Sequence, residues 1–200
     1  MVFAGMCVVF ATQANAVTFN FQENGPGDLG PTSTFTESGF SLTASGFLTS
    51  GGTTNLFSKN LGAGEIGLGT TSDPSGQHEI VFSNFVQLTL PTTPPSNFQM
   101  VIGGSVTNGE IADVYFTTSA GTLAGATLIG QITTTGGFVS IPAGDQTGFV
   151  DITAHANGDN VLLASVEISP VPEGGSTVAF LGMALAGLEG VRRMVRARKA

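Results

Sequence analysis

The alternation of apolar and polar positions along residues 17–170 predicts short β-strands and no helix. β-branched and aromatic residues recur with a period of two, which is typical of strands that bury one face. Turn-forming residues separate these segments, for example at 23–28, 91–95 and 157–160. About ten short strands without a linker or repeat predict one all-β domain, an antiparallel two-sheet sandwich of the jelly-roll-like kind. The predicted strands are 17–22, 39–44, 79–82, 85–90, 98–102, 111–118, 128–134, 136–141, 148–153 and 161–168.

Phenylalanine supplies nearly all the aromatic mass of this domain, because the chain has 15 Phe, one Tyr and no Trp. We expect the phenylalanines at strand positions to fill the core and not to form a ligand platform. These residues are Phe40, Phe82, Phe98, Phe116, Phe138 and Phe149.

The apolar segment at residues 1–10 predicts a signal peptide over residues 1–16. Ala14 and Ala16 place small residues where signal peptidase inspects the chain, so we expect export through the Sec translocon and a cut after Ala16. No Lys or Arg precedes the apolar run, which leaves open where the true start lies. An N-terminal strand that packs into the core is the alternative. Once Cys7 is removed, the mature chain has no thiol for disulfides or catalysis.

A second apolar stretch, residues 176–191, is followed at once by a basic tail at 192–200. As a helix this stretch would be about 24 Å long, somewhat short of the roughly 30 Å hydrocarbon core of a membrane. The basic tail would hold the C-terminal end on the cytoplasmic side. A soluble amphipathic helix is the alternative, but the polar residues cluster at one end and lack a helical period. Five of the six basic residues of the chain form this tail: Arg192, Arg193, Arg196, Arg198 and Lys199.

A short motif at residues 171–177 stands directly before the predicted helix, and it contains Val171, Pro172, Glu173, Gly174 and Gly175. A Pro-Glu motif, a transmembrane helix and an Arg-rich end, in this order, resemble the PEP-CTERM sorting signal of exported bacterial proteins. Val-Pro-acidic-Gly-Gly-Ser-Thr is closer to the variant called VPDSG-CTERM, with a glutamate in place of its aspartate.

The resemblance covers residues 171–200 and implies recognition by an exosortase, a membrane-embedded processing enzyme. Cleavage near Pro172-Glu173 would then release the domain at 17–170 or transfer it to the cell surface or an extracellular polymer. In that interpretation Pro172 and Glu173 are substrate residues and not catalytic ones. An ordinary single-pass membrane anchor is the alternative.

Acidic and basic residues occupy different parts of the chain. The formal net charge is −8, yet residues 17–170 carry twelve acidic residues against the single basic residue Lys59, which gives −11. A nucleic-acid partner is not expected, because such partners need clustered Lys and Arg. The acidic composition suits a secreted surface protein, although the acids could serve solubility alone.

A glycine-rich run at 61–69 leads into a second motif at 73–80. The two together resemble a segment that recurs in PEP-CTERM ectodomains of the β-sandwich kind, and the resemblance implies no activity. The run is not a phosphate-binding loop, because no Lys follows the glycines. Glu65, Asp73 and Glu79 supply hard oxygen donors and are candidate calcium ligands. The alternative is that the glycines permit tight turns while the acids face solvent.

Two histidines are the main candidates for catalysis. His78 is adjacent to Glu79, and His155 lies four residues after Asp151 on the same face of a strand, so either could form an acid-base pair. Neither histidine has metal-ligand spacing to another His or Cys. Paired carboxylates for glycoside hydrolysis are also available, but no pair is singled out among the acids. We therefore do not expect an enzyme.

These features together predict an exported bacterial surface or extracellular-matrix protein with a structural or adhesive role. A carbohydrate-binding sandwich, with extracellular polysaccharide as its partner, is the alternative, and exposed aromatic residues on one sheet face would favour it. A secreted hydrolase is the third hypothesis, and it would require two carboxylates or a histidine pair in a cleft.

Overall fold

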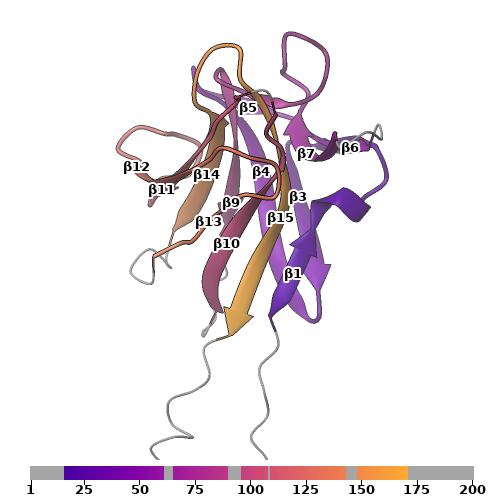
Figure 1. Ribbon diagram of the computed structural model, residues 1–200, viewed down its shortest axis with the longest axis vertical. Helices are drawn as coiled ribbons and strands as arrows, with labels where there is room; N and C mark the ends of the chain where they lie inside the picture. The colour runs from indigo at the N-terminus through magenta and orange to yellow at the C-terminus, as the bar shows by residue number, and fades with distance from the viewer. Residues whose placement is uncertain (1–15, 61–64, 90–95, 108, 143–147, 171–200) are drawn as a thin grey trace, which may run out of the picture. The chain divides into compact units, whose positions relative to one another are not determined.

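The computed structural model describes residues 16–60, 65–89, 96–107, 109–142 and 148–170, and residues 16–169 form one compact unit. This unit consists of two β-sheets (Figure 1). Sheet A contains β1 (Val17–Asn20), β2 (Gly27–Gly30), β6 (Leu56–Asn60), β7 (Ile66–Thr70), β8 (Ile80–Val81), β10 (Ser96–Ser105), β13 (Phe138–Val139) and β15 (Asn160–Pro170). Sheet B contains β3 (Thr32–Glu37), β4 (Phe40–Leu48), β5 (Thr53–Thr54), β9 (Asn84–Thr89), β11 (Ala112–Thr117), β12 (Thr127–Ile132) and β14 (Phe149–Ala154).

The predicted all-β class with two antiparallel sheets is confirmed. Sheet A has the order β13-β10-β15-β7-β6-β2, and sheet B has the order β12-β11-β14-β9-β4-β3. Within the described ranges the only helical segment is the three-residue 3-10 helix η1 (Phe21–Glu23), and none of these residues forms a helix able to cross a membrane.

Strand β15 organises sheet A because four strands pair with it along its length. It meets β8 at residues 160–161, β7 at Leu163 and β1 at residues 165–168, and β10 runs beside it. Figure 1 shows β1 and β15 side by side, so the described chain begins and ends at the same end of the sandwich. The turn between β14 and β15 lies at the opposite end (Figure 1).

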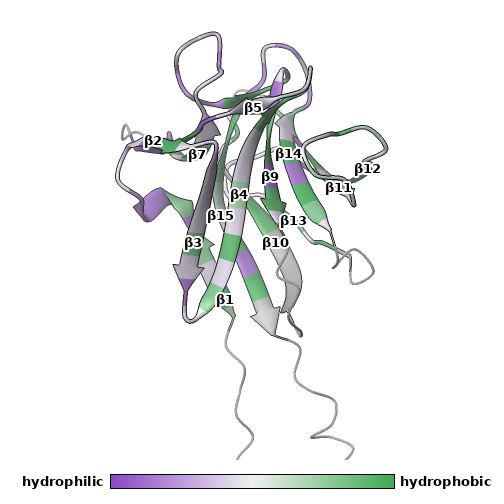
Figure 2. Ribbon diagram, turned by 180° about the vertical axis from the view of Figure 1, so that it is seen from behind, coloured by the Kyte–Doolittle hydropathy of each residue, from purple (hydrophilic) through white to green (hydrophobic). Residues whose placement is uncertain are grey.

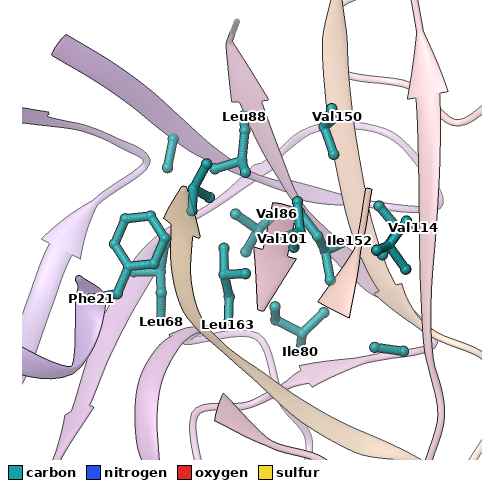
Figure 3. Packing of buried hydrophobic residues seen from close by; sticks show 14 of the residues in the cluster. Phe21, Leu68, Ile80, Val86, Leu88, Val101, Val114, Val150, Ile152 and Leu163 are labelled. Carbon is teal, nitrogen blue, oxygen red and sulfur yellow. The ribbon is translucent and has the colours of Figure 1, made fainter. Parts of the chain in front are cut away.

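The core fills the space between the two sheets (Figure 3). Along β14, residues Val150 and Ile152 point inward and are fully buried, while Asp151 and Thr153 take the other face. The hydropathy colouring of β4 and β14 alternates in the same way (Figure 2). This period of two is the pattern expected of a strand with one face on the core.

Glycines allow β7 to lie unusually close to its neighbours. A Cβ added at Gly67 would lie 2.6 Å from the carbonyl oxygen of Leu163, and one added at Gly69 would clash with the carbonyl oxygen of His78. A Cβ at Gly104 of β10 would lie 2.6 Å from the carbonyl oxygen of Ile66. The glycine-rich run therefore continues into a strand in which the glycines serve close backbone approach.

Five strands were not among the predicted ones: β2, β3, β5, β6 and β7. Within the glycine-rich run, for which no strand is predicted, Ile66 to Thr70 form β7 because Gly67 and Gly69 allow close backbone approach while Leu68 packs in the core. In the other direction, the predicted strand 136–141 is reduced to the two residues of β13.

The prediction that strand phenylalanines fill the core is wrong for Phe40, Phe82 and Phe138, which are exposed. Phe82 lies in the turn between β8 and β9, and Phe138 points away from the core because its neighbour Val139 takes the inward side of β13. Phe116 packs against the core from a partly buried position, and Phe149 is also partly buried. Phe98 belongs to β10. Among the residues whose side chains are described, the fully enclosed phenylalanines are Phe19, Phe21 and Phe85.

Several predicted segments lie outside the described residues. They are the signal segment at 1–15 with Ala14, positions 61–64 of the glycine-rich run, the motif at 171–177, the helix at 176–191 and the basic tail at 192–200.

Candidate functional site

A cluster of polar side chains lies on the outer face of sheet B, where β11, β12 and the end of β14 meet. Asp113 stands at its centre with a nearly buried side chain. Gln131 Nε2 donates to Asp113 Oδ1 at 2.8 Å, and the Tyr115 hydroxyl donates to Asp113 Oδ2 at 3.1 Å. His155 Nδ1 lies 3.0 Å from Asp113 Oδ2. One carboxylate thus orients three different hydrogen-bonding side chains.

Strand register explains why these residues meet. Asp113 and Tyr115 are two apart in β11 and share a face. Asp113 pairs with Gln131 of β12 on one side and with Thr153 of β14 on the other. His155 follows β14 directly, two residues beyond Thr153, and so comes to the same face.

Asp113 fixes the chemical state of its partners. Because a carboxylate only accepts hydrogen bonds, the proton of the His155 ring must reside on Nδ1. The hydrogen bond and charge of Asp113 raise the pKa of His155 above its ordinary value. Burial raises the pKa of Tyr115, and the Asp113 charge adds to this effect, so the hydroxyl stays protonated and remains a donor.

The cluster borders a pocket of about 250 Å³. Asp113, Tyr115 and His155 form its polar side, while Leu123 and Phe82 supply apolar surface. Phe82 is 55% exposed, so its ring is accessible at the edge of the pocket. An exposed aromatic ring next to converging donors and acceptors is the composition of a site for a small polar ligand.

The outer face of sheet B carries a second buried layer beside this pocket. The segment 118–126, between β11 and β12, covers it: Gly121 N donates to Gln87 Oε1 at 3.0 Å, and Gln87 Nε2 contacts the carbonyl oxygen of Ser119 at 3.4 Å. Phe47 and Phe85 stack beneath this segment with ring centroids 5.4 Å apart. The segment that supplies Leu123 to the pocket is therefore anchored on the sheet.

Asp151 is enclosed in this layer. Its Oδ1 accepts a hydrogen bond from Gln87 Nε2 at 2.7 Å, and its buried Oδ2 has no partner. Burial raises the pKa of Asp151 from 3.8 to about 7, although the bond from Gln87 acts in the opposite direction. Asp151 is thus held as a neutral acid below neutral pH.

Two of the predicted calcium ligands, Glu65 and Glu79, both contact the ammonium group of Lys59. Lys59 Nζ lies 2.7 Å from Glu79 Oε1 and 2.9 Å from Glu65 Oε2. The Lys59 side chain is fully buried, whereas Glu65 is half exposed. Burial alone would lower the pKa of Lys59, but its bonds to the two carboxylates raise it. Burial raises the pKa of Glu79 in spite of Lys59.

The third candidate ligand, Asp73, holds a turn. Its carboxylate accepts hydrogen bonds from the backbone N–H groups of Ser75, Gln77 and Glu79, and from the Ser75 hydroxyl at 2.6 Å. Burial alone would raise the pKa of Asp73, but these bonds hold it below its ordinary value. Among the described residues, no group of three or more His, Cys, Asp or Glu side chains is arranged to hold a metal ion.

Both histidine pairs suggested by the sequence differ from those in the structure. His155 contacts Asp113 in place of Asp151. His78 stacks on Phe57 with ring centroids 4.0 Å apart, while the adjacent Glu79 turns to Lys59. Sequence reasoning missed Asp113, Tyr115 and Gln131 as site residues, and the available signal was polar residues at alternate positions of strand 111–118.

Comparison with protein-family models, with curated proteins and with solved structures finds no match to this chain.

We expect Lys59→Met to lower the free energy of unfolding by about 3–5 kcal/mol, because Glu79 would be left as a buried charge without a partner. Restoring neutrality in the double variant Lys59→Met/Glu79→Gln should recover most of this loss. Urea denaturation followed by circular dichroism measures both. If the single and double variants are equally destabilised, the ion pair is not the source of the effect.

We expect the stability of the protein to fall as pH rises from about 4 to about 7, because the folded state retains a proton on Asp151 that the unfolded chain releases near pKa 3.8. Asp151→Asn keeps the shape and removes this titration, so its melting temperature should exceed that of the wild type at pH 8 and approach it at pH 4. The exposed Glu37→Gln controls for the loss of one negative charge. An equal change in melting temperature for both variants at pH 8 would refute the role of Asp151.

Proposed function

We propose that this chain is an exported surface or matrix protein with an adhesive role, and that it holds carbohydrate in the pocket beside Asp113. In this proposal the signal at 1–16 directs export, and an exosortase processes the C-terminal segment near Pro172-Glu173. Extracellular polysaccharide is the partner. No activity as an enzyme is proposed.

The observation that carries the carbohydrate proposal is the convergence of three side chains on Asp113 at the wall of a pocket that also exposes Phe82. Sugars present hydroxyl groups that both donate and accept, together with apolar C–H faces that pack on aromatic rings. The Tyr115 hydroxyl and the His155 ring are held in fixed orientations by Asp113, so they lose little freedom when a ligand binds. Phe82 supplies the apolar platform.

The position of the pocket supports an adhesive role. The pocket residues Ala154 and His155 lie at the start of the β14–β15 turn. From this end, the 11 residues of β15 run to Pro170, a distance of about 35 Å in a strand. The described chain therefore ends at the end of the sandwich opposite the pocket (Figure 1). The pocket end carries neither terminus of the described domain, so it is free to bind a partner.

The strand order supports a jelly-roll-like sandwich as the finer fold. From β9 onward the chain passes between the sheets repeatedly: β9, β11, β12 and β14 belong to sheet B, and β10, β13 and β15 belong to sheet A. Such alternation between two antiparallel sheets is the connection pattern of jelly rolls. Jelly-roll folds serve many functions, so the carbohydrate proposal rests on the pocket and not on the fold.

A secreted hydrolase is the second candidate, because Asp113 and His155 form a carboxylate-imidazole pair at a pocket. A hydrolase of this kind also needs a nucleophile beside the imidazole. Three hydroxyl residues line the pocket: Thr49, Tyr115 and Thr153. The Thr153 hydroxyl donates to the carbonyl oxygen of Asn84, and the Tyr115 hydroxyl donates to Asp113. None of the three forms a hydrogen bond with His155 in the described structure, which favours binding over catalysis.

The sorting proposal predicts that the protein released to the cell surface lacks residues 174–200. Intact-mass measurement of the surface fraction from the producing bacterium should give a chain that ends near Pro172-Glu173. A mature chain that still contains Arg192 to Lys199 would contradict exosortase processing and favour an ordinary membrane anchor.

The carbohydrate proposal predicts that the protein binds neutral glycans on an array and that Tyr115→Phe and Asp113→Asn weaken this binding about tenfold or more. Tyr115→Phe removes one hydroxyl and leaves the ring, so its folding can be matched to the wild type by circular dichroism. Glu37→Gln, an exposed change on β3, serves as the control and should bind as the wild type does. Absence of binding to every neutral glycan, or unchanged binding by both site variants, would refute the proposal.

A further inference from the structure

A second pocket, of about 300 Å³, lies on the other side of Phe82. Loop residues from two parts of the chain line it: Ser75 and Ser83 from one part, and Asn157 and Asn160 from the β14–β15 turn. Asn157 and Ser75 are exposed and bring an amide and a hydroxyl to the pocket. The Asn157 amide can donate and accept, whereas the Ser75 hydroxyl already donates to Asp73 and can only accept from a sugar hydroxyl.

Phe82 is a wall of both pockets. The β14–β15 turn also connects the two pockets. β14 ends at Ala154 beside the first pocket, and β15 begins at Asn160 beside the second. Sites for small molecules usually measure roughly 300–1,000 Å³. Each pocket alone lies at or below the lower end of this range, whereas the two together fall within it. The exposed Phe82 ring then lies in the middle of one elongated site.

Charge restricts the ligand that such a site accepts. Asp113 lines the first pocket and Asp73 the second. Lys59 is the only basic residue of positions 17–170, and its side chain is fully buried against Glu65 and Glu79. No exposed Lys or Arg is therefore available in the described domain to pair with a uronate or sulfate group, and the net charge of −11 over residues 17–170 repels polyanions.

We propose that the ligand is a neutral linear oligosaccharide that crosses Phe82 and occupies both pockets, with one sugar unit beside Asp113 and another beside Asn157. This inference rests on the proposed carbohydrate-binding function and specifies its ligand class. The Phe82 ring packs on the apolar face of the central sugar unit of the oligosaccharide. The exposure of Phe82, which does not fit a role in the core, follows from this position.

The test is the dependence of affinity on chain length, measured by calorimetry on the full chain with cello-, malto- and chito-oligosaccharides from one to six units. Affinity for the series that binds should rise about tenfold or more between the monosaccharide and the trisaccharide and then level off. Phe82→Ala and Asn157→Ala should lower trisaccharide affinity about tenfold, and Asn157→Ala should lower monosaccharide affinity by a smaller factor. Oligogalacturonate of matched length should bind more weakly than the neutral oligosaccharide.

Phe82 and Asn157 are exposed, so both variants are expected to fold, and Glu37→Gln is the control.

The outcomes separate this inference from the function on which it rests. Equal affinity for short and long chains, with loss of binding in Tyr115→Phe and none in Asn157→Ala, would overturn the two-pocket site and leave the carbohydrate function standing. Tighter binding of oligogalacturonate would overturn the neutral ligand class. No binding to any of the three neutral series would overturn the inference, and absence of binding to every neutral glycan on the array would overturn the proposed function as well.

Discussion

At Gly67 and Gly69 the main chain of β7 lies so close to its neighbours that no side chain fits, and the buried ion pair and the turn beside β7 depend on this contact. Gly67 faces the carbonyl oxygen of Leu163 in β15, and Gly69 faces the carbonyl oxygen of His78. Because Lys59 of β6 pairs with Gly67, the ammonium group of Lys59 comes within reach of Glu65 before β7 and of Glu79 after His78. The ion pair is thus a consequence of close backbone packing.

The same contact determines where the binding end of the molecule lies. With His78 held against β7, the Asp73 carboxylate gathers the backbone N–H groups of Ser75, Gln77 and Glu79 into one turn. The chain then enters β8, which pairs with the start of β15 and delivers Phe82 to the rim of the sandwich. Buried polar contacts at one edge of sheet A therefore support an exposed aromatic residue at the pocket end.

The sequence predicted the class of the fold well, because alternation of apolar residues records directly which strand faces are buried. Val150 and Ile152 in β14 are an example. The prediction failed at β7, where glycines and not polar residues alternate with Ile66 and Leu68. It also failed at Phe82, where an apolar residue is exposed in a turn. The spacing of apolar residues records neither the close backbone contact at β7 nor the exposure of a single apolar residue in a turn.

The candidate site could be predicted only in part, for a different physical reason. His155 was recognised as chemically relevant, but its partner Asp113 lies 42 residues away in the chain. Which strands become neighbours and in which register depends on the assembled sheet and not on local sequence. Likewise, Glu65 and Glu79 were expected as calcium ligands, whereas in the structure both contact the buried ammonium group of Lys59, which was not foreseen.

Nuclear magnetic resonance titration with a neutral oligosaccharide tests the central claim most directly, because it locates the ligand on the molecule. If the oligosaccharide crosses Phe82, amide shifts should change in two stretches far apart in sequence, around residues 82–83 and around residues 153–160. The shifts of Asp113 and Tyr115 should change as well. Shift changes confined to another surface, such as the β3–β4 face, would contradict it.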